Sequence, residues 1–257
     1  MPTQQQHISQ GYCQNCGRDH TLGMAEAEKH CYELMKHLEE HRTIDLFPAN
    51  ATRDPQLSTD FLFGEARGKM FGILTCRTRE GARVNLRAFS GQFNGRWQVP
   101  GWAPPLFNVE DMESLTADVE KTIKRMGREI LHPDCSRQQQ QDVRRQRREL
   151  SRELMKEIHS LYRLFNFRGK EETIFTAYIG QNGIPNGTGD CCAPKLFSLA
   201  ARKNLIPLGI AEFYWGRENS SKTRDHGRFY PSCLEKCQPI LGFMLCGLEE
   251  LHAAINQ

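Results

Sequence analysis

The sequence lacks any long hydrophobic run and any N-terminal leader pattern. A transmembrane helix requires about 20 consecutive apolar residues, and no run in the 257 residues approaches that length. The N-terminal stretch MPTQQQHISQ has neither the basic nor the apolar segment of a secretory signal peptide. We therefore expect a cytoplasmic protein with no membrane partner.

A strong net charge is absent as well. The formal net charge is +3, which is only a weak indication of a polyanionic partner, so the placement of charge along the chain matters more than its total. Hydrophobic residues at 39% and charged residues at 25% describe an ordinary globular protein. A chain of this length can form one elaborated domain, or one domain with an extension.

Hydrophobic periodicity and turn residues predict an α/β fold. In order, the expected elements are a helix in 24–41, two strands in 68–93 with Gly81 in their turn, a basic helical segment in 110–170, a helix from about 192, a strand at 206–214 and a helix at 239–255. Without the basic segment, the order is helix, strand, strand, helix, strand, helix. The predicted units are a zinc-knuckle extension (1–23), an α/β domain (24–109 and 171–257) and a helical insertion (110–170).

Cysteine, in contrast, is plentiful, and in a reducing compartment the ten cysteines favour metal binding or catalysis over disulfides. Proline is tolerated only in the first turn of a helix. Pro194 and Pro239 therefore place helix starts next to Cys191 and next to the C-x3-C pair of Cys233 and Cys237. A helix N-terminus lowers thiol pKa values, and thiolates are the ligands that zinc prefers. These three cysteines would form a zinc site with an open fourth position, as in catalytic zinc sites.

Three other interpretations of these cysteines stay open. They could be buried thiols without a ligand. They could hold a structural zinc ion with His226 as the fourth ligand. Cys191 at a helix start could also pair with His226 as a nucleophile and base, although this leaves Cys233 and Cys237 unexplained.

The element order and the ligand pattern together resemble the zinc-dependent cytidine deaminase superfamily. That resemblance implies a mixed sheet flanked by helices and a glutamate two residues after the first ligand, which moves protons. This sequence departs there, because Ala193 follows Cys191 at that spacing. Glu212 and Asp190 are the candidate replacements. Asp190 could instead cap or orient the helix start, and Glu212 could simply pair with a basic residue.

A closer resemblance covers roughly residues 60–250. The segments GKMFGIL, LRAFSG, GTGDCCAPKLFSLAARKNLIPLGIAEFYWG and HGRFYPSCLEKCQPILGFMLCG are similar to the accessory part of certain large RluA-type pseudouridine synthases. That part is a deaminase-like domain with a helical insertion, and the enzymes use it to convert a tRNA cytidine to uridine before isomerisation. Its single cysteine matches Cys191, so Cys192 would be a packing neighbour.

The synthase half of that family, with its R-L-D-type motif, has no counterpart in this sequence. The resemblance therefore implies zinc-dependent cytidine deamination in RNA, with tRNA as the expected substrate and a separate pseudouridine synthase as a partner. The competing interpretation is a zinc-containing RNA-binding module without catalysis, in which the missing glutamate marks lost activity.

A second zinc site is predicted near the N-terminus. The pattern C-x2-C-x3-H-x10-C supplies Cys13, Cys16, His20 and Cys31, which suits a closed structural site. His30, His37 or His41 could substitute as a ligand, and a flexible tail with an idle C-x2-C pair is the alternative. The site would attach the tail to the domain or contact RNA.

Basic and aromatic residues predict contacts with RNA. The candidates for phosphate contacts are Arg144, Arg145, Arg147, Arg148 and Arg152, and those for base stacking are Trp97, Trp102, Tyr214 and Trp215. A solvated helix face explains the arginines equally well, and burial in the core is the commoner fate of aromatic residues at strand ends.

Overall fold

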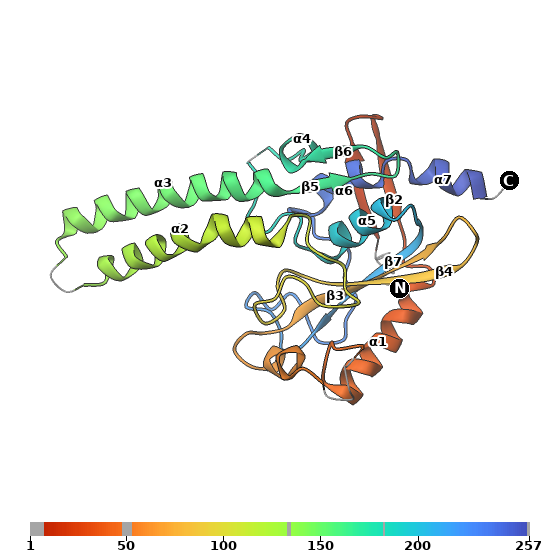
Figure 1. Cartoon of the computed structure of the whole chain (residues 1–257), viewed down its shortest axis with the longest axis horizontal. Helices are drawn as coiled ribbons and strands as arrows, with labels where there is room; N and C mark the ends of the chain where they lie inside the picture. The colour runs from red at the N-terminus through yellow and green to blue at the C-terminus, as the bar shows by residue number, and fades with distance from the viewer. Residues whose placement is uncertain (1–7, 48–52, 133–134, 182, 256–257) are drawn as a thin grey trace, which may run out of the picture.

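The computed structural model describes residues 8–47, 53–132, 135–181 and 183–255. It shows an α/β body from which two long helices project together (Figure 1). In the part of the chain that is described, no helix is both long and apolar enough to cross a membrane.

A three-stranded sheet forms the centre of the body. It contains β3 (Lys69–Arg77), β4 (Arg83–Phe89) and β7 (Ile206–Trp215) in the order β4-β3-β7. The expected hairpin is confirmed, and Gly81 has a φ of +96° in its turn. The expected mixed sheet is not found in the described residues, because β3 pairs antiparallel with both neighbours. Since β3 is buried along most of its length, layers must cover both faces of the sheet.

Helices cover the two faces of this sheet (Figure 1). On one face lies α1 (Ala27–His41), which buries Cys31, Leu34 and Leu38 in a core with aromatic side chains of the sheet. On the other face lies α5 (Cys192–Arg202), whose apolar side chains join a second core. The β7 side chains alternate between these cores, so Phe213 belongs to the α1 side and Glu212 lies beside Cys192 on the α5 side.

An N-terminal hairpin packs on a helix from the other end of the chain. The hairpin strands are β1 (Ser9–Cys13) and β2 (Arg18–Leu22), and the helix is α6 (Gln238–Leu245). The backbones meet at Gly11 and Gly242, where a Cβ atom on Gly242 would lie 1.9 Å from a backbone carbonyl oxygen of β1. Only glycine permits this close approach.

The expected last helix is in fact two helices. After α6, the chain turns at Cys246 and Gly247 before α7 (Leu248–Ile255) begins. Gly247 has a φ of +98°, which a helix interior does not allow. The prediction of one helix over 239–255 was wrong because the apolar pattern continues through this turn.

The projecting helices are α2 (Val109–Ile130) and α3 (Arg137–Leu161), which we call the arm (Figure 1). The Asn108 side chain caps α2, and a capping box of Ser136 and Gln139 starts α3. The remaining short elements are η2 (Pro55–Leu57), η3 (Asp60–Phe63), β5 (Arg163–Phe165), β6 (Glu171–Thr173) and α4 (Ile174–Ala177).

Candidate metal centres

Three thiols converge at the start of two helices, and we call them the three-thiol cluster. Cys191 is the N-cap of α5, Cys237 is the N-cap of α6, and Cys233 lies in the preceding loop. All three sulfur atoms lie within 4.8 Å of one another, and the Sγ atoms of Cys233 and Cys237 are 3.4 Å apart. The structure thus brings together the residues that the two helix-starting prolines predicted.

Local backbone geometry explains this convergence. Pro194 and Pro239 both lie in the first turn of their helices, where a missing N–H group costs nothing. The backbone N–H groups of Cys237 and Gln238 both donate to the carbonyl oxygen of Cys233, which folds C-x3-C into a single turn. Hydrogen bonds from Cys191 and Cys237 lower the pKa of the Cys233 thiol, although its burial opposes this.

Glu212 projects from β7 beside this cluster. It is 7% exposed, and the Ser232 hydroxyl donates to its Oε1 atom at 3.3 Å. Burial raises the pKa of the carboxyl group to about 7, although the hydrogen bond from Ser232 opposes this shift. The negative charge of Cys233 contributes to this increase. Gly72 on β3 leaves the necessary room, since a Cβ atom there would lie 3.2 Å from the Glu212 side chain.

Asp190 is hydrogen-bonded to the residue that follows α3. Its Oδ1 atom accepts a hydrogen bond of 2.7 Å from the Tyr162 hydroxyl, and burial raises its pKa. The nearby Lys195 is 1% exposed and donates to the carbonyl oxygens of Phe89 and Gly91. Lys195 was not predicted. Burial lowers the pKa of its ammonium group to about 8, although the charge of Asp190 opposes this shift.

His226 is not part of the three-thiol cluster. Its Nδ1 atom accepts from the backbone N–H group of Gly216, and its ring packs against Trp215 at 4.2 Å between centroids. His226 was expected either as the fourth zinc ligand or as the base for Cys191. Both expectations are wrong for the same reason. The loop that follows β7 places it against Trp215, whose neighbours belong to the α1 core, and the Cys191 sulfur faces two other thiols.

A second cluster, which we call the terminal cluster, contains Cys13, Cys16, His20 and Cys246. Their ligand atoms also lie within 4.8 Å of one another. The predicted fourth member, Cys31, was wrong. It lies fully buried on the inner face of α1, where its thiol donates to the carbonyl oxygen of Ala211. The glycine that follows Cys246 signals a helix end at this position, but it does not identify a ligand.

The three histidines that could have substituted as ligands lie on or at the end of α1 and outside both clusters. His30 contacts Glu33 at 2.8 Å, and His37 and His41 pack edge-on against each other. They contribute to the surface of α1 and to its packing.

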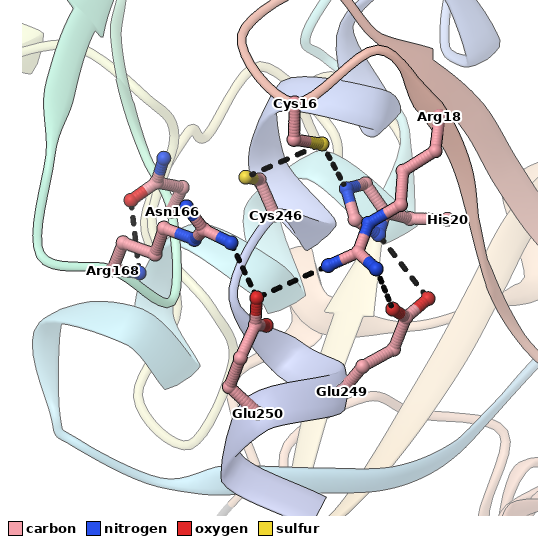
Figure 2. Close-up of polar contacts among 8 residues, drawn as sticks. All are labelled: Cys16, Arg18, His20, Asn166, Arg168, Cys246, Glu249 and Glu250. Atoms are coloured by element: carbon pink, nitrogen blue, oxygen red, sulfur yellow. Dashed lines mark hydrogen bonds and ion pairs between the residues drawn. The ribbon is translucent and has the colours of Figure 1, made fainter.

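Charged side chains surround the terminal cluster (Figure 2). The Oε1 atom of Glu249 lies 3.3 Å from Nδ1 of His20. Because a carboxylate only accepts hydrogen bonds, Nδ1 carries the proton and Nε2 is left free, 3.0 Å from the Cys16 sulfur. A carboxylate that orients a histidine in this way is typical of zinc sites.

Two arginines pair with the two glutamates beside the terminal cluster. Arg18 pairs with Glu249 and Glu250, and Arg168 also pairs with Glu250 (Figure 2). Burial raises the pKa of Cys16, yet its hydrogen bonds with His20 and neighbouring groups lower it to about 7. The terminal cluster therefore has a complete set of four ligands and an organised outer shell, whereas the three-thiol cluster has three ligands.

The four aromatic residues considered for base stacking lie at different depths. Trp102 is 6% exposed and its indole N–H donates to a backbone carbonyl group at 2.9 Å. Tyr214 and Trp215 are also buried, at 3% and 4% exposure. Trp97 is half-buried and packs edge-on against another ring. Burial leaves Trp102, Tyr214 and Trp215 no free ring face for a base.

The five predicted arginines of α3 are all exposed. Two surface hollows of about 540 and 520 Å³ lie away from the clusters, one at the base of the arm beside Arg163 and Arg202, the other beside Phe63 and His226.

Comparison of the chain with protein-family models, with curated proteins and with solved structures found no match.

Proposed function

We propose that the chain is a zinc-dependent deaminase that converts cytidine to uridine in RNA, with tRNA as the substrate class. The observation that carries this proposal is the buried Glu212 carboxyl group beside the three-thiol cluster. Three protein ligands leave one coordination position for a substrate or water, which is the arrangement of catalytic zinc sites.

The donor set fits zinc. Thiolates are its preferred ligands, and both Cys191 and Cys237 begin helices, where the dipole favours negative charge. Bound by these three sulfur atoms, zinc would supply a water molecule of lowered pKa as the nucleophile. The terminal cluster, with four ligands, would hold a structural zinc ion.

Glu212 is the residue to which we assign proton transfer. Hydrolytic deamination adds water at C4 of cytosine and releases ammonia, so protons must pass from water to the ring and to the leaving amino group. A carboxyl group with a pKa of about 7 exists in both protonation states near neutral pH, which suits it for accepting and returning a proton. Ser232 fixes one of its oxygen atoms.

In this proposal, the glutamate that transfers protons is Glu212 of β7 and not a residue of α5. Ala193 occupies the position where the related deaminases carry their glutamate, and its side chain is fully buried in the α5 core. Asp190 is bonded to Tyr162, so we assign it a structural role.

The test is conversion of cytidine in bulk tRNA, measured by sequencing for C-to-T changes. Zinc-loaded wild-type protein should convert a defined site, and the Cys191→Ala and Glu212→Gln variants should not. Asp190→Asn is the matched control, because it changes a neighbouring buried carboxyl group and should retain conversion. Unchanged conversion by Glu212→Gln would refute the role of Glu212.

The second candidate function is a zinc-containing RNA-binding module without catalysis. The observation that favours it is Ala193 in place of the usual glutamate. Zinc content and tRNA binding without conversion by the wild-type protein would establish this alternative. A separate pseudouridine synthase stays a predicted partner for the deaminase.

A further inference from the structure

Charge in the arm is separated along its length. The outer halves of the two helices, 121–130 of α2 and 137–148 of α3, carry nine Lys and Arg residues against two acidic residues. The inner halves, 109–120 and 149–161, carry eight acidic residues against two basic ones. The formal net charge is thus +7 in the outer half and −6 in the half next to the body.

A solvated helix normally mixes the two signs, because Glu–Lys pairs three or four residues apart stabilise it. The arm has only three such pairs among its described residues: Lys121 with Asp118, Lys124 with Glu120, and Arg145 with Asp142. Arg144, Arg147 and Arg148 form no ion pair within the described ranges, and all three are exposed. This part of the arm therefore offers unpaired cations to a partner.

The positive residues of the two helices lie together at the outer end. The Arg147 guanidinium lies over Gly127, 3.8 Å from where a Cβ atom would be. Gly127 is flanked on α2 by Arg125 and Arg128. Like charges brought together in this way are destabilising in the free protein, which indicates a role in binding a polyanion.

Helix geometry gives the distance between this surface and the inner end of the arm. Residue 144 lies 17 residues from the end of α3, so the centre of the outer half is about 25 Å along the arm from the body. Tyr162, which follows α3 directly, bonds to Asp190, the residue before Cys191. The inner end of the arm therefore lies next to the three-thiol cluster.

We propose that the outer half of the arm binds the phosphate backbone of a folded RNA while the acidic inner half repels RNA from the surface between. This inference rests on the proposed function for its second contact, the target cytidine at the three-thiol cluster. An RNA that makes both contacts must place its phosphates about 25 Å farther out along the arm than its target base, given the helix rise. It must do so without lying along the arm. A rigid folded RNA meets this requirement, whereas a flexible single strand crossing the acidic surface does not.

The experiment compares two triple variants of α3. Arg144→Gln, Arg147→Gln and Arg148→Gln together neutralise the outer half, and Glu149→Gln, Glu153→Gln and Glu157→Gln neutralise the inner half of the same helix. Glutamine keeps helix propensity similar, and circular dichroism confirms folding. Binding of bulk tRNA and of a 20-nucleotide unstructured RNA is measured at several salt concentrations for the zinc-loaded proteins.

We expect the outer variant to bind tRNA roughly 10- to 100-fold more weakly, with the slope of log K against log salt reduced by about 2 to 3. The inner variant should bind the unstructured RNA more tightly than wild type does. An unchanged salt slope in the outer variant, or an equal loss for both RNAs, would overturn the inference.

The readout separates this inference from the proposed function. If the wild type deaminates tRNA and the outer variant binds and deaminates it equally well, the inference fails and the deaminase stands. If the outer variant loses tRNA binding as expected while the wild type deaminates nothing, the deaminase fails and the phosphate surface is supported.

Discussion

Replacement of Cys246 tests the corrected ligand set of the terminal cluster. The structure brings together Cys13, Cys16, His20 and Cys246, which could hold one metal ion, and leaves Cys31 outside this group. We expect Cys246→Ala to remove one of two zinc ions per chain. Cys31→Ala is the matched control and should retain both.

The loss of stability in Cys246→Ala can be calculated from the loop that a metal ion at the terminal cluster closes. A metal held by residues 13–20 and by Cys246 closes a loop of about 230 residues. For a covalent cross-link, a loop of this length corresponds to about 5 kcal/mol of stabilisation through chain entropy, and we expect Cys246→Ala to lose about this much. Cys31→Ala deletes one buried sulfur atom and should cost about 1 kcal/mol.

Elemental analysis after gel filtration gives the zinc content, and urea unfolding with a reductant present gives the stability. Cys246→His offers an imidazole in place of the thiol, so this variant should recover zinc if Cys246→Ala fails to fold. Two zinc ions in Cys246→Ala together with one in Cys31→Ala would refute the assignment.

Three further predictions concern the surroundings of the two clusters. Glu249→Gln should weaken zinc binding at the terminal cluster about 10- to 100-fold in a competition assay, because it replaces the charged acceptor of the His20 N–H group with a neutral amide, whereas Glu250→Gln should have a smaller effect. Tyr162→Phe removes one hydrogen-bond partner of the buried Asp190 carboxyl group, so urea unfolding should show a loss of about 1–3 kcal/mol in the free energy of unfolding. Burial lowers the pKa of His159, whose Nε2 atom has no partner within the described residues. The unfolded chain therefore takes up a proton first, so stability should fall as pH falls through about 6.5. His159→Phe should reduce this loss, and equal changes in melting temperature between pH 7.5 and 5.5 for both proteins would contradict it.

The elements that the sequence predicted well are those with a strong local signal. Alternating and continuous apolar runs predicted β3, β4 and β7, and the prolines at 194 and 239 predicted the helix starts that bring three thiols together. These signals depend only on neighbours in the chain.

The features that were missed depend on residues far apart in the sequence. Cys246 joins Cys13 across the packing of β1 on α6, and Cys31 satisfies a helical periodicity that equally describes a core position. The burial of Trp102 and the position of His226 follow from tertiary packing, which a single sequence does not encode in any local pattern.

The packing of β1 on α6 also bears on how the protein is made. The hairpin that supplies Cys13, Cys16 and His20 leaves the ribosome about 220 residues before α6 is complete. At 5–20 residues per second this interval is roughly 10–50 s. During that time β1 lacks the helix on which it packs, and the terminal cluster has three of its four members. The hairpin therefore docks on α6 long after its own synthesis.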